Sequence, residues 1–481
     1  MLLKKSLLAI YLLALISLCG QCNKNGSGSK TPDPPPTPGT PDIEAWLTKA
    51  DQSVLLQKQN QVLSFGSVGN SYPMVEVDET KKYQEVEGFG FTLTGGSAQL
   101  INAMEATAKA NLLQELFGNS PTSIGISYLR LSMGASDLDE RVFSYNDLLA
   151  GQTDVEQNQF SIVPDKENLL PVLKSILAIH SNIKIIATPW SPPAWMKDNN
   201  SSIGGSLKPE YYNSYAKYFV RYIQAMKAEG ITITAITPQN EPLHPGNNPS
   251  MYMTAEQQRD FIKHNLGPAF QAAGLTTKII VYDHNLDRPD YPTTIYNDAE
   301  AAKYVDGAAF HLYAGDVAAM GNLHDAFPNK NLYFTEQWTG ANGTFDGDLQ
   351  WHIKNVIIGT MRNWSRLAME WNLANNSTFG PHTPGGCTEC KGALTINGSA
   401  ISRNVAYYII GHASKFVSAG SIRIESNFAG AVQNVAFLRP DGKKVLIALN
   451  EGTTPYTFNL KYKSKWAPVT LQGKSVVTLI W

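Results

Sequence analysis

The chain has 481 residues, 43% of them hydrophobic and 17% charged, with a formal net charge of −2. This length is sufficient for one large domain and a smaller one, and the composition is that of a globular protein. Because 39 basic residues are balanced by 41 acidic ones, the charge gives no indication of nucleic acid as a partner.

The N-terminus predicts export. Lys4 and Lys5 precede an apolar run that ends at Leu18, which is typical of a signal-peptide core and too short to span a membrane. Residues 1–18 are therefore predicted to be a signal peptide of lipoprotein type, acylated at Cys19 or Cys22, with plain secretion as the alternative. Residues 19–42 are rich first in Gly and Ser and then in Pro, which predicts a flexible linker. We expect the protein to be lipid-anchored at the periplasmic or cell-surface face of a Gram-negative-type outer membrane, or secreted.

Residues 85–420 alternate short apolar runs with helix-length stretches. The predicted strands are 86–93, 127–133, 183–188, 233–237, 278–282, 307–312, 331–335 and 366–371. The helix-length stretches are 97–117, 169–180, 210–230, 255–274, 346–364 and 402–418. Eight such strands predict an α/β fold, a (β/α)₈ barrel. A doubly wound sheet is less favoured, because Gly88-Phe89-Gly90 lacks the third glycine of a phosphate-binding turn.

Beyond Gly420 the pattern changes to short strands separated by turns such as Pro440-Asp441-Gly442. This pattern predicts an antiparallel β-sandwich over 421–481. Residues 43–84 are also strand-like, and we expect them to join the sandwich.

Two glutamates stand where predicted strands end. Glu241 lies in Thr-Pro-Gln-Asn-Glu-Pro after the fourth strand, and Glu336 lies in Phe-Thr-Glu-Gln-Trp at the end of the seventh. A retaining glycosidase needs two carboxyl groups about 5 Å apart, one as acid/base and one as nucleophile. The fourth and seventh strands face each other across a barrel mouth, so these two carboxylates suit that chemistry. We assign Glu241 as acid/base and Glu336 as nucleophile, although spacing alone does not decide between the two roles.

Other polar and aromatic residues also follow the predicted strands, where a barrel keeps its active site. They are Arg130, Asp137, Trp190, Trp195, Asn240, His284, His311, Tyr313, Trp338, Trp371 and Asn372. Asn240 could bind a sugar 2-hydroxyl, and Arg130 is expected to hold a carboxylate charged rather than to touch substrate. Structural alternatives remain open: a hydrogen-bonded core role for His311, packing for the tryptophans and a helix cap for Asp137. His284, Trp195 and Asn372 are weaker candidates.

Cys387 and Cys390 are the cysteines left after the signal segment. In an exported chain a single C-x-x-C pair favours a local disulfide, with free thiols as the alternative. A zinc site would need a second pair of ligands.

Eight motifs together resemble glycoside hydrolase family 30, which includes glucosylceramidases and endo-β-1,6-glucanases. They are GFG…LT (88–94), YLRLSMGASD (128–137), ATPWSPPAWMK (187–197), TPQNEP (237–242), HLYAGD (311–316), FTEQW (334–338), MEWNLA (369–374) and IIGHASKFVSAGS (409–421). The resemblance extends from about residue 45 to the C-terminus. One departure is that Thr94 is followed by Gly95, where the family often carries Thr-Asp.

The resemblance implies a (β/α)₈ barrel fused to a β-sandwich and retaining cleavage, with Glu241 as acid/base and Glu336 as nucleophile. It also implies that six residues line the subsite for the non-reducing glucose: Asp137, Trp190, Asn240, His311, Tyr313 and Trp371. We add Trp338 to the substrate-binding residues and expect neither a metal nor an organic cofactor.

The residues around Glu336 and after the eighth strand resemble the bacterial β-1,6-glucanase branch of the family. We therefore expect an endo-β-1,6-glucanase that acts as a monomer on β-glucan oligosaccharides or polysaccharides. The alternatives are a glucosylceramidase, another β-glycosidase such as a xylanase, or a non-catalytic glycan-binding surface lipoprotein.

Overall fold

The computed structural model describes residues 42–67 and 69–481. The predicted signal peptide and nearly all of the predicted linker lie outside these residues. Within the described part of the chain, every helix is too short or too polar to cross a membrane.

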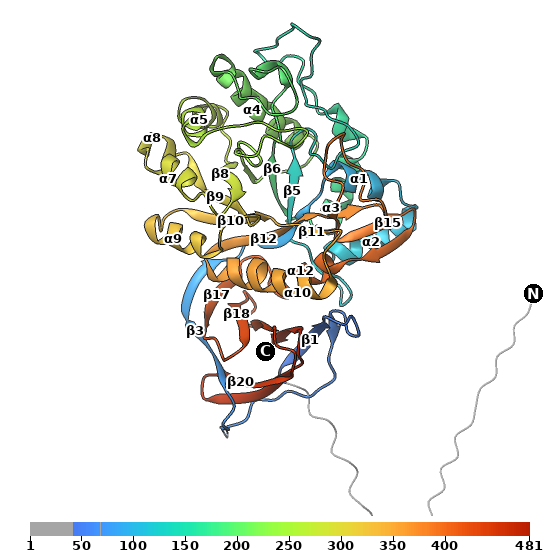
Figure 1. The fold of residues 1–481 in the computed structure, drawn as a ribbon, viewed down its shortest axis with the longest axis vertical. Coiled ribbons are helices and arrows are strands. Elements are labelled where there is room, and N and C mark those ends of the chain that lie inside the picture. The colour runs from blue at the N-terminus through green and yellow to red at the C-terminus, as the bar shows by residue number, and fades with distance from the viewer. Residues whose placement is uncertain (1–41, 68) are drawn as a thin grey trace, which may run out of the picture. The chain divides into compact units, whose positions relative to one another are not determined.

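Eight parallel strands close into a barrel, in the order β10-β12-β4-β5-β6-β7-β8-β9 (Figure 1). They are β4 (Gly88–Thr92), β5 (Tyr128–Ser132), β6 (Lys184–Thr188), β7 (Ala235–Ile236), β8 (Lys278–Asn285), β9 (Val305–His311), β10 (Asn331–Glu336) and β12 (Ser365–Asn372). This confirms the predicted fold class. Strand β7 is shorter than the predicted 233–237, but it occupies the predicted place between β6 and β8.

The barrel interior is filled with side chains. Seven strands contribute to one buried cluster, which consists of Tyr128, Ile186, Ala235, Ile280, Ala309, Tyr333, Leu367 and Met369. Such a barrel is a packed core rather than a pore, so its chemistry is confined to the loops at the carboxyl ends of the strands.

Helices follow the barrel strands, as predicted, but three of the predicted helices are interrupted. The helix predicted over 97–117 is broken into α1 (Gly95–Asn102) and α2 (Ala106–Phe117), and Glu105 caps α2 by accepting from two backbone N–H groups. Those predicted over 255–274 and 346–364 each contain a π-helical turn, Ile262–Leu266 and Ile353–Gly359. The remaining helices are α3 (Leu169–Ile179), α4 (Tyr212–Ala228), α5 (Ala255–Phe261), α6 (Gly267–Ala272), α7 (Asp290–Tyr296), α8 (Ala299–Ala302), α9 (Ala318–Ala326), α10 (Phe345–His352), α11 (Thr360–Arg362) and α12 (Val405–Ser414).

The second domain is a nine-stranded sheet wrapped around its own apolar core, in the order β2-β1-β22-β19-β18-β17-β3-β20-β21. Its strands are β1 (Glu44–Lys49), β2 (Gln57–Lys58), β3 (Met74–Glu85), β17 (Ile422–Ser426), β18 (Val432–Leu438), β19 (Lys444–Asn450), β20 (Tyr456–Tyr462), β21 (Lys465–Leu471) and β22 (Ser475–Ile480). The N-terminal strands join this sheet, as expected. The sheet is not antiparallel throughout, because β20 pairs in parallel with the free edge of β3.

The barrel and the sheet are joined directly through the backbone. Val86, just before β4, donates to the carbonyl of Ser421 and accepts from Gly420. His412 on α12 lies between the hydroxyls of Thr48 and Thr478, both of which belong to the sheet. The sheet therefore contacts the barrel domain at α12.

Candidate active site

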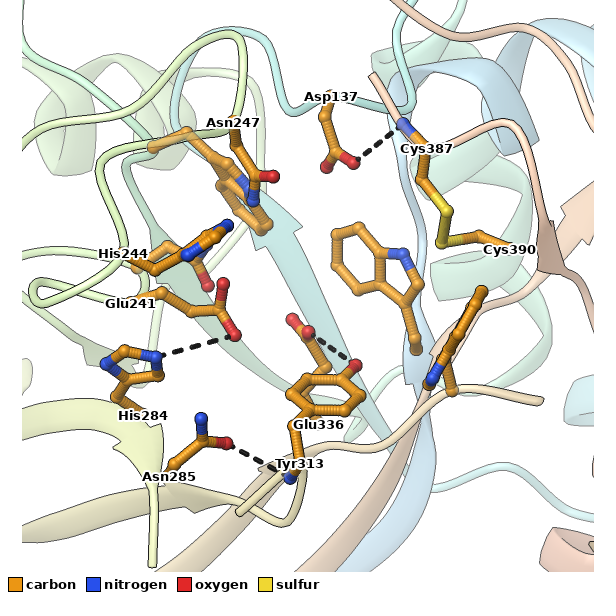
Figure 2. A pocket seen from close by; sticks show the side chains of 14 residues that line it. Asp137, Glu241, His244, Asn247, His284, Asn285, Tyr313, Glu336, Cys387 and Cys390 are labelled. Carbon is orange, nitrogen blue, oxygen red and sulfur yellow. Dashed lines mark hydrogen bonds and ion pairs between the residues drawn. A yellow bond between two sulfur atoms is a disulfide. The ribbon is translucent and has the colours of Figure 1, made fainter. Parts of the chain in front are cut away.

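A cavity of about 360 Å³ opens at the carboxyl ends of the barrel strands (Figure 2). It is lined by Asp137, Trp190, Asn240, Glu241, His244, Asn247, His284, Asn285, Tyr313, Glu336, Trp338, Trp371, Cys387 and Cys390. All nine of the predicted catalytic and substrate-binding residues line this pocket except His311, which lies directly behind it against Glu241.

The two predicted catalytic glutamates face each other. Glu336 is the last residue of β10, and Glu241 follows β7 in a short loop. One carboxylate oxygen of each lies within 4.8 Å of the other. This separation suits direct attack by one carboxylate, whereas an inverting pair must stand farther apart to admit a water molecule.

The backbone at Glu241 adopts a left-handed conformation with φ of 44°, which is unusual for a non-glycine residue. Its N–H donates to the carbonyl of Asp283 at 3.0 Å, and its own carbonyl accepts from the N–H of His244. Local strain of this kind persists only where the surroundings enforce it, and here it directs the carboxylate toward Glu336.

Arg130 on β5 is fully buried and organises the site. Its Nη1 donates to Glu336 Oε2 at 2.5 Å, and its Nη2 donates to Asp283 Oδ2 at 2.9 Å and to Asn240 Oδ1 at 2.7 Å. Tyr313 donates its hydroxyl to the other Glu336 oxygen at 2.9 Å. Both oxygens of Glu336 are therefore held in place, and one of them is held by a permanent cation.

His311 at the end of β9 links the second glutamate to the same network. Its Nδ1 is 3.1 Å from Glu241 Oε1, and its Nε2 is 3.2 Å from Asp283 Oδ1. Burial opposes its charge, but the Glu336 carboxylate and the bonds to Asp283 and Glu241 raise the pKa of His311 to about 9. A protonated imidazole can donate to both carboxylates at once.

The two glutamates differ in their surroundings. Burial disfavours the charge of both, yet the hydrogen bond from His311 lowers the pKa of Glu241. Burial, together with the nearby Glu241 carboxylate, raises the pKa of Glu336 despite His311 and Arg130. Carboxylates this close titrate as a pair, so the resting position of a proton does not distinguish their roles. The hydrogen bonds of the two glutamates differ. Both oxygens of Glu336 accept hydrogen bonds, whereas Glu241 Oε2 accepts none from the described residues.

Comparison with known proteins places this arrangement in a family. The sequence model of the Glycosyl hydrolase family 30 TIM-barrel domain matches residues 86–417, and that of the Glycosyl hydrolase family 30 beta sandwich domain matches residues 420–479. The chain belongs to glycosyl hydrolase family 30.

Individual relatives agree with the family. Endo-1,6-beta-D-glucanase BGN16.3 of Trichoderma harzianum is 34% identical over 410 residues, which are 80% of this chain and 82% of the relative. Lysosomal acid glucosylceramidase of Mus musculus is 30% identical over 441 residues, covering 85% and 83%. The solved structure of the endo-beta1,6-glucanase BT3312 superposes with a TM-score of 0.85 at 35% identity, covering 92% of this chain and 99% of that one.

Asp137 lies at the opposite side of the family 30 pocket from Glu241 (Figure 2). Its Oδ2 accepts from the backbone N–H of Cys387 at 3.3 Å. Burial, and then the charge of Glu336, raise the pKa of Asp137 to about 7. The side chain is not a helix cap. Among the described residues no cation forms a salt bridge with this buried carboxyl group, which a hydroxyl group can stabilise by donating a hydrogen bond.

Aromatic rings form the remaining wall on this side. The rings of Trp190 and Trp371 lie 5.4 Å apart, and the guanidinium of Arg130 lies 4.8 Å and 5.6 Å from them. Cys387 and Cys390 form the predicted disulfide and pack against this cluster. The disulfide is therefore part of the pocket wall rather than a remote surface clip.

Of the three weaker candidates from the sequence, one lines the pocket and two do not. His284 lines the pocket at 4.0 Å from Glu241, and burial lowers its pKa to about 4. Trp195 does not reach the pocket, because its Nε1 donates to the carbonyl of Asn146 in the core. Asn372 is also structural, since its Oδ1 accepts from Thr94 and Ser97.

Sequence reasoning missed Asp283, which joins Arg130 to His311 beneath both glutamates. Arg130 holds the pKa of this fully buried carboxyl far below its ordinary value, although burial works against ionisation. The available signal was its place at the end of the fifth strand, directly before His284. The pocket residues His244, Asn247 and Asn285 were also missed: His244 and Asn247 lie in a loop whose course the sequence does not reveal, and Asn285 is the last residue of β8, beyond the predicted end of that strand.

The departure at Gly95 has a structural counterpart. A Cβ at Gly95 would lie 1.6 Å from Oδ1 of Asp139, so a larger residue cannot be accommodated there without displacing that carboxylate. Asp139 itself accepts from the N–H and hydroxyl of Ser136. An acidic group is thus present beside the end of β4, contributed by the loop after β5.

The donor set does not favour a resident metal ion. Glu241, His311 and Glu336 bring one ligand atom each within 4.8 Å of one another. However, Glu336 already forms a salt bridge with Arg130, and both ring nitrogens of His311 already face carboxylates. A cation would have to compete with these charges.

Proposed function

We propose that this chain is a retaining endo-β-1,6-glucanase in which Glu336 is the nucleophile and Glu241 the acid/base. The observation that carries the proposal is the close approach of the two carboxylates, together with the clamp of Arg130 and Tyr313 on Glu336. That clamp orients one carboxylate rigidly, as attack on an anomeric carbon requires.

In the first step, Glu336 attacks the anomeric carbon while Glu241 protonates the departing glycosidic oxygen, and a glucosyl ester forms on Glu336. The ester carries no charge, so the repulsion that favoured a proton on Glu241 disappears and its pKa falls. Glu241 then accepts a proton from water, which attacks the ester and releases a sugar of unchanged configuration. His311 stabilises the Glu241 carboxylate that exists between the two steps.

Substrate contacts are assigned by position. Asp137 and Asn240 reach the hydroxyls of the sugar that is cleaved, and Trp190, Trp338 and Trp371 supply apolar surface for its faces. His311 and Tyr313 act by holding the two glutamates.

The lining of the pocket favours a sugar over a lipid as the leaving group. On the side of Glu241, where the leaving group must lie, the lining consists of His244, Asn247, His284 and Asn285. The described lining residues include no aliphatic side chain, and a ceramide would leave its apolar surface against these polar groups. The relatives named above as endo-1,6-glucanases support the same choice, and the mouse glucosylceramidase is the alternative.

Export completes the proposal. The predicted signal segment and the Cys387–Cys390 disulfide both suit an oxidising compartment outside the cytoplasm. We further propose that the mature protein is anchored through an acylated cysteine and acts as a monomer.

The deciding experiment incubates the purified protein separately with β-1,6-glucan, glucosylceramide and xylan and sizes the products. Mixed β-1,6-linked oligosaccharides from the first substrate alone support the proposal, and activity on the lipid alone overturns it. Glu336→Gln is the control and should lose activity on every substrate. If the wild type binds glucan without releasing any product, the chain is a glycan-binding protein.

A further inference from the structure

A second cavity of about 350 Å³ adjoins the catalytic pocket, and Trp338 belongs to the lining of both. The cavity is lined by Gln337, Trp338, Gly340, Asn342, Gly343, Asp348, Trp351, His352 and Glu389. Most of these residues come from the loop after β10 and from α10. Apart from Trp338, its lining residues do not line the catalytic pocket.

A short ribbon contributes residues to the lining of both cavities. Strand β11 (Thr339–Gly340) pairs with β14 (Cys390–Lys391), and the ribbon carries both the disulfide that faces the catalytic pocket and Glu389 that faces the second cavity. The second cavity therefore lies on the side of the disulfide. Figure 2 shows the disulfide and Asp137 across the pocket from Glu241 and His284. Because Glu241 serves the leaving group, the second cavity is on the other side of the cleaved bond.

Two features of this cavity indicate a ligand. Trp351 exposes 40% of its surface, an unusual fraction for so large an aromatic side chain, and it forms part of the wall. Gln337 is only 6% exposed, yet its Oε1 has no hydrogen-bond partner among the described residues. A buried amide oxygen without a partner is costly unless a ligand or water donates to it. An aromatic face beside polar groups is also the combination that binds a sugar ring.

We propose that this cavity binds a further glucosyl unit of the substrate chain, on the non-reducing side of the bond that is cleaved. This inference rests on the proposed function and adds to it the side of the cleaved bond on which the substrate chain is bound. Trp351 is the platform for the sugar ring, Trp338 bridges the two binding positions, and Gln337 and Asp348 accept hydrogen bonds from sugar hydroxyls. Binding energy from a sugar remote from the reacting bond can be used to raise the rate, so longer chains should react faster.

The test uses aryl β-glycosides that carry one, two, three or four β-1,6-linked glucosyl units. The aryl group is the leaving group, so every added sugar must lie on the non-reducing side. For the wild type we expect kcat/KM to rise about tenfold as units are added. Trp351→Ala and, independently, Asp348→Ala should remove most of that rise, and Trp351→Phe should keep part of it. Tyr72→Ala removes an aromatic side chain that is 49% exposed, in the other domain, and should keep the full rise.

The outcomes separate the two proposals. If the wild type cleaves the one-unit substrate but shows no rise with length, or if the rise survives in both Trp351→Ala and Asp348→Ala, the second binding position is refuted and the proposed function stands. If the wild type cleaves none of these substrates, both fall. Unfolding temperatures of the variants distinguish lost binding from lost folding.

Discussion

Arg130 and Glu336 form a salt bridge with an N–O distance of 2.5 Å, and the arginine side chain is completely inaccessible to solvent. The same guanidinium is also bonded to Asp283. Taking these charges out of water is expensive, and only their mutual contacts offset the cost. Glu336 and Asp283 therefore compensate the buried charge of Arg130.

Removing this cation should damage both folding and catalysis. Arg130→Met removes the cation that is bonded to two buried carboxylates, so we expect a loss of about 3–5 kcal/mol in the free energy of unfolding. We also expect at least about 10²-fold lower kcat, since the nucleophile is no longer oriented. Denaturant titration and kinetics on an aryl β-glucoside measure the two effects. The matched control is Arg288→Met, which removes an exposed pair with Asp290 and should cost less than about 1 kcal/mol.

Anion rescue can distinguish the two glutamates. In Glu241→Ala, an aryl β-glucoside with a good leaving group can still form the ester on Glu336, and added azide should raise the rate and yield β-glucosyl azide. In Glu336→Ala, azide takes the place of the nucleophile and should yield the α-azide. Nuclear magnetic resonance of the products identifies the configuration. The opposite pattern would exchange the two assigned roles.

The buried carboxyl of Asp137 should make stability depend on pH. Its pKa is raised from 3.8 to about 7, so the folded protein binds this proton more tightly than the unfolded chain does. Its stabilising contribution is complete below about pH 3.8 and is lost as the pH rises through about 7. Asp137→Asn should thus gain stability relative to the wild type between pH 5 and pH 8, while KM rises about tenfold because a sugar contact is lost. Melting curves across this range test the first effect.

Asp325→Asn provides the control, because it makes the same replacement at an exposed position. Equal melting curves for Asp137→Asn and wild type above pH 7 would refute the buried-charge account of Asp137.

The disulfide should matter for substrate binding more than for chemistry. It closes a loop of four residues, so its removal should cost about 2 kcal/mol of stability. The N–H of Cys387 bonds Asp137, whereas Glu241 and Glu336 are held by other elements. In the double variant Cys387→Ser/Cys390→Ser we therefore expect KM to rise several-fold with a smaller change in kcat. A reductant should reproduce this effect in the wild type and leave the double variant unaffected. Unchanged KM in the double variant would show that the loop is rigid without the bond.

Much of the fold follows from local patterns in the chain. Each barrel strand is a short apolar run that must be buried on both faces. The sequence therefore predicts that these strands exist and in which order they follow one another. The exact ends of the elements are harder to predict. Strand β7 comprises only Ala235–Ile236, and the helix predicted over 97–117 breaks where the Glu105 side chain caps α2. Pairing between distant segments, such as the parallel β3–β20 contact, has no local signal.

For the active site, the residue types at the strand ends can be read directly from the chain, and they are sufficient to select Glu241 and Glu336. The contacts that hold these two side chains, in contrast, depend on the folding of distant segments onto one another. Asp283, Arg130 and His311 come from three different strands, and their contacts depend on barrel closure, which brings β5, β8 and β9 around one point. The second cavity also depends on the tertiary structure, since Trp351 on α10 lines it together with Glu389, which lies directly before β14 and is brought beside the loop after β10 by the pairing of β11 with β14.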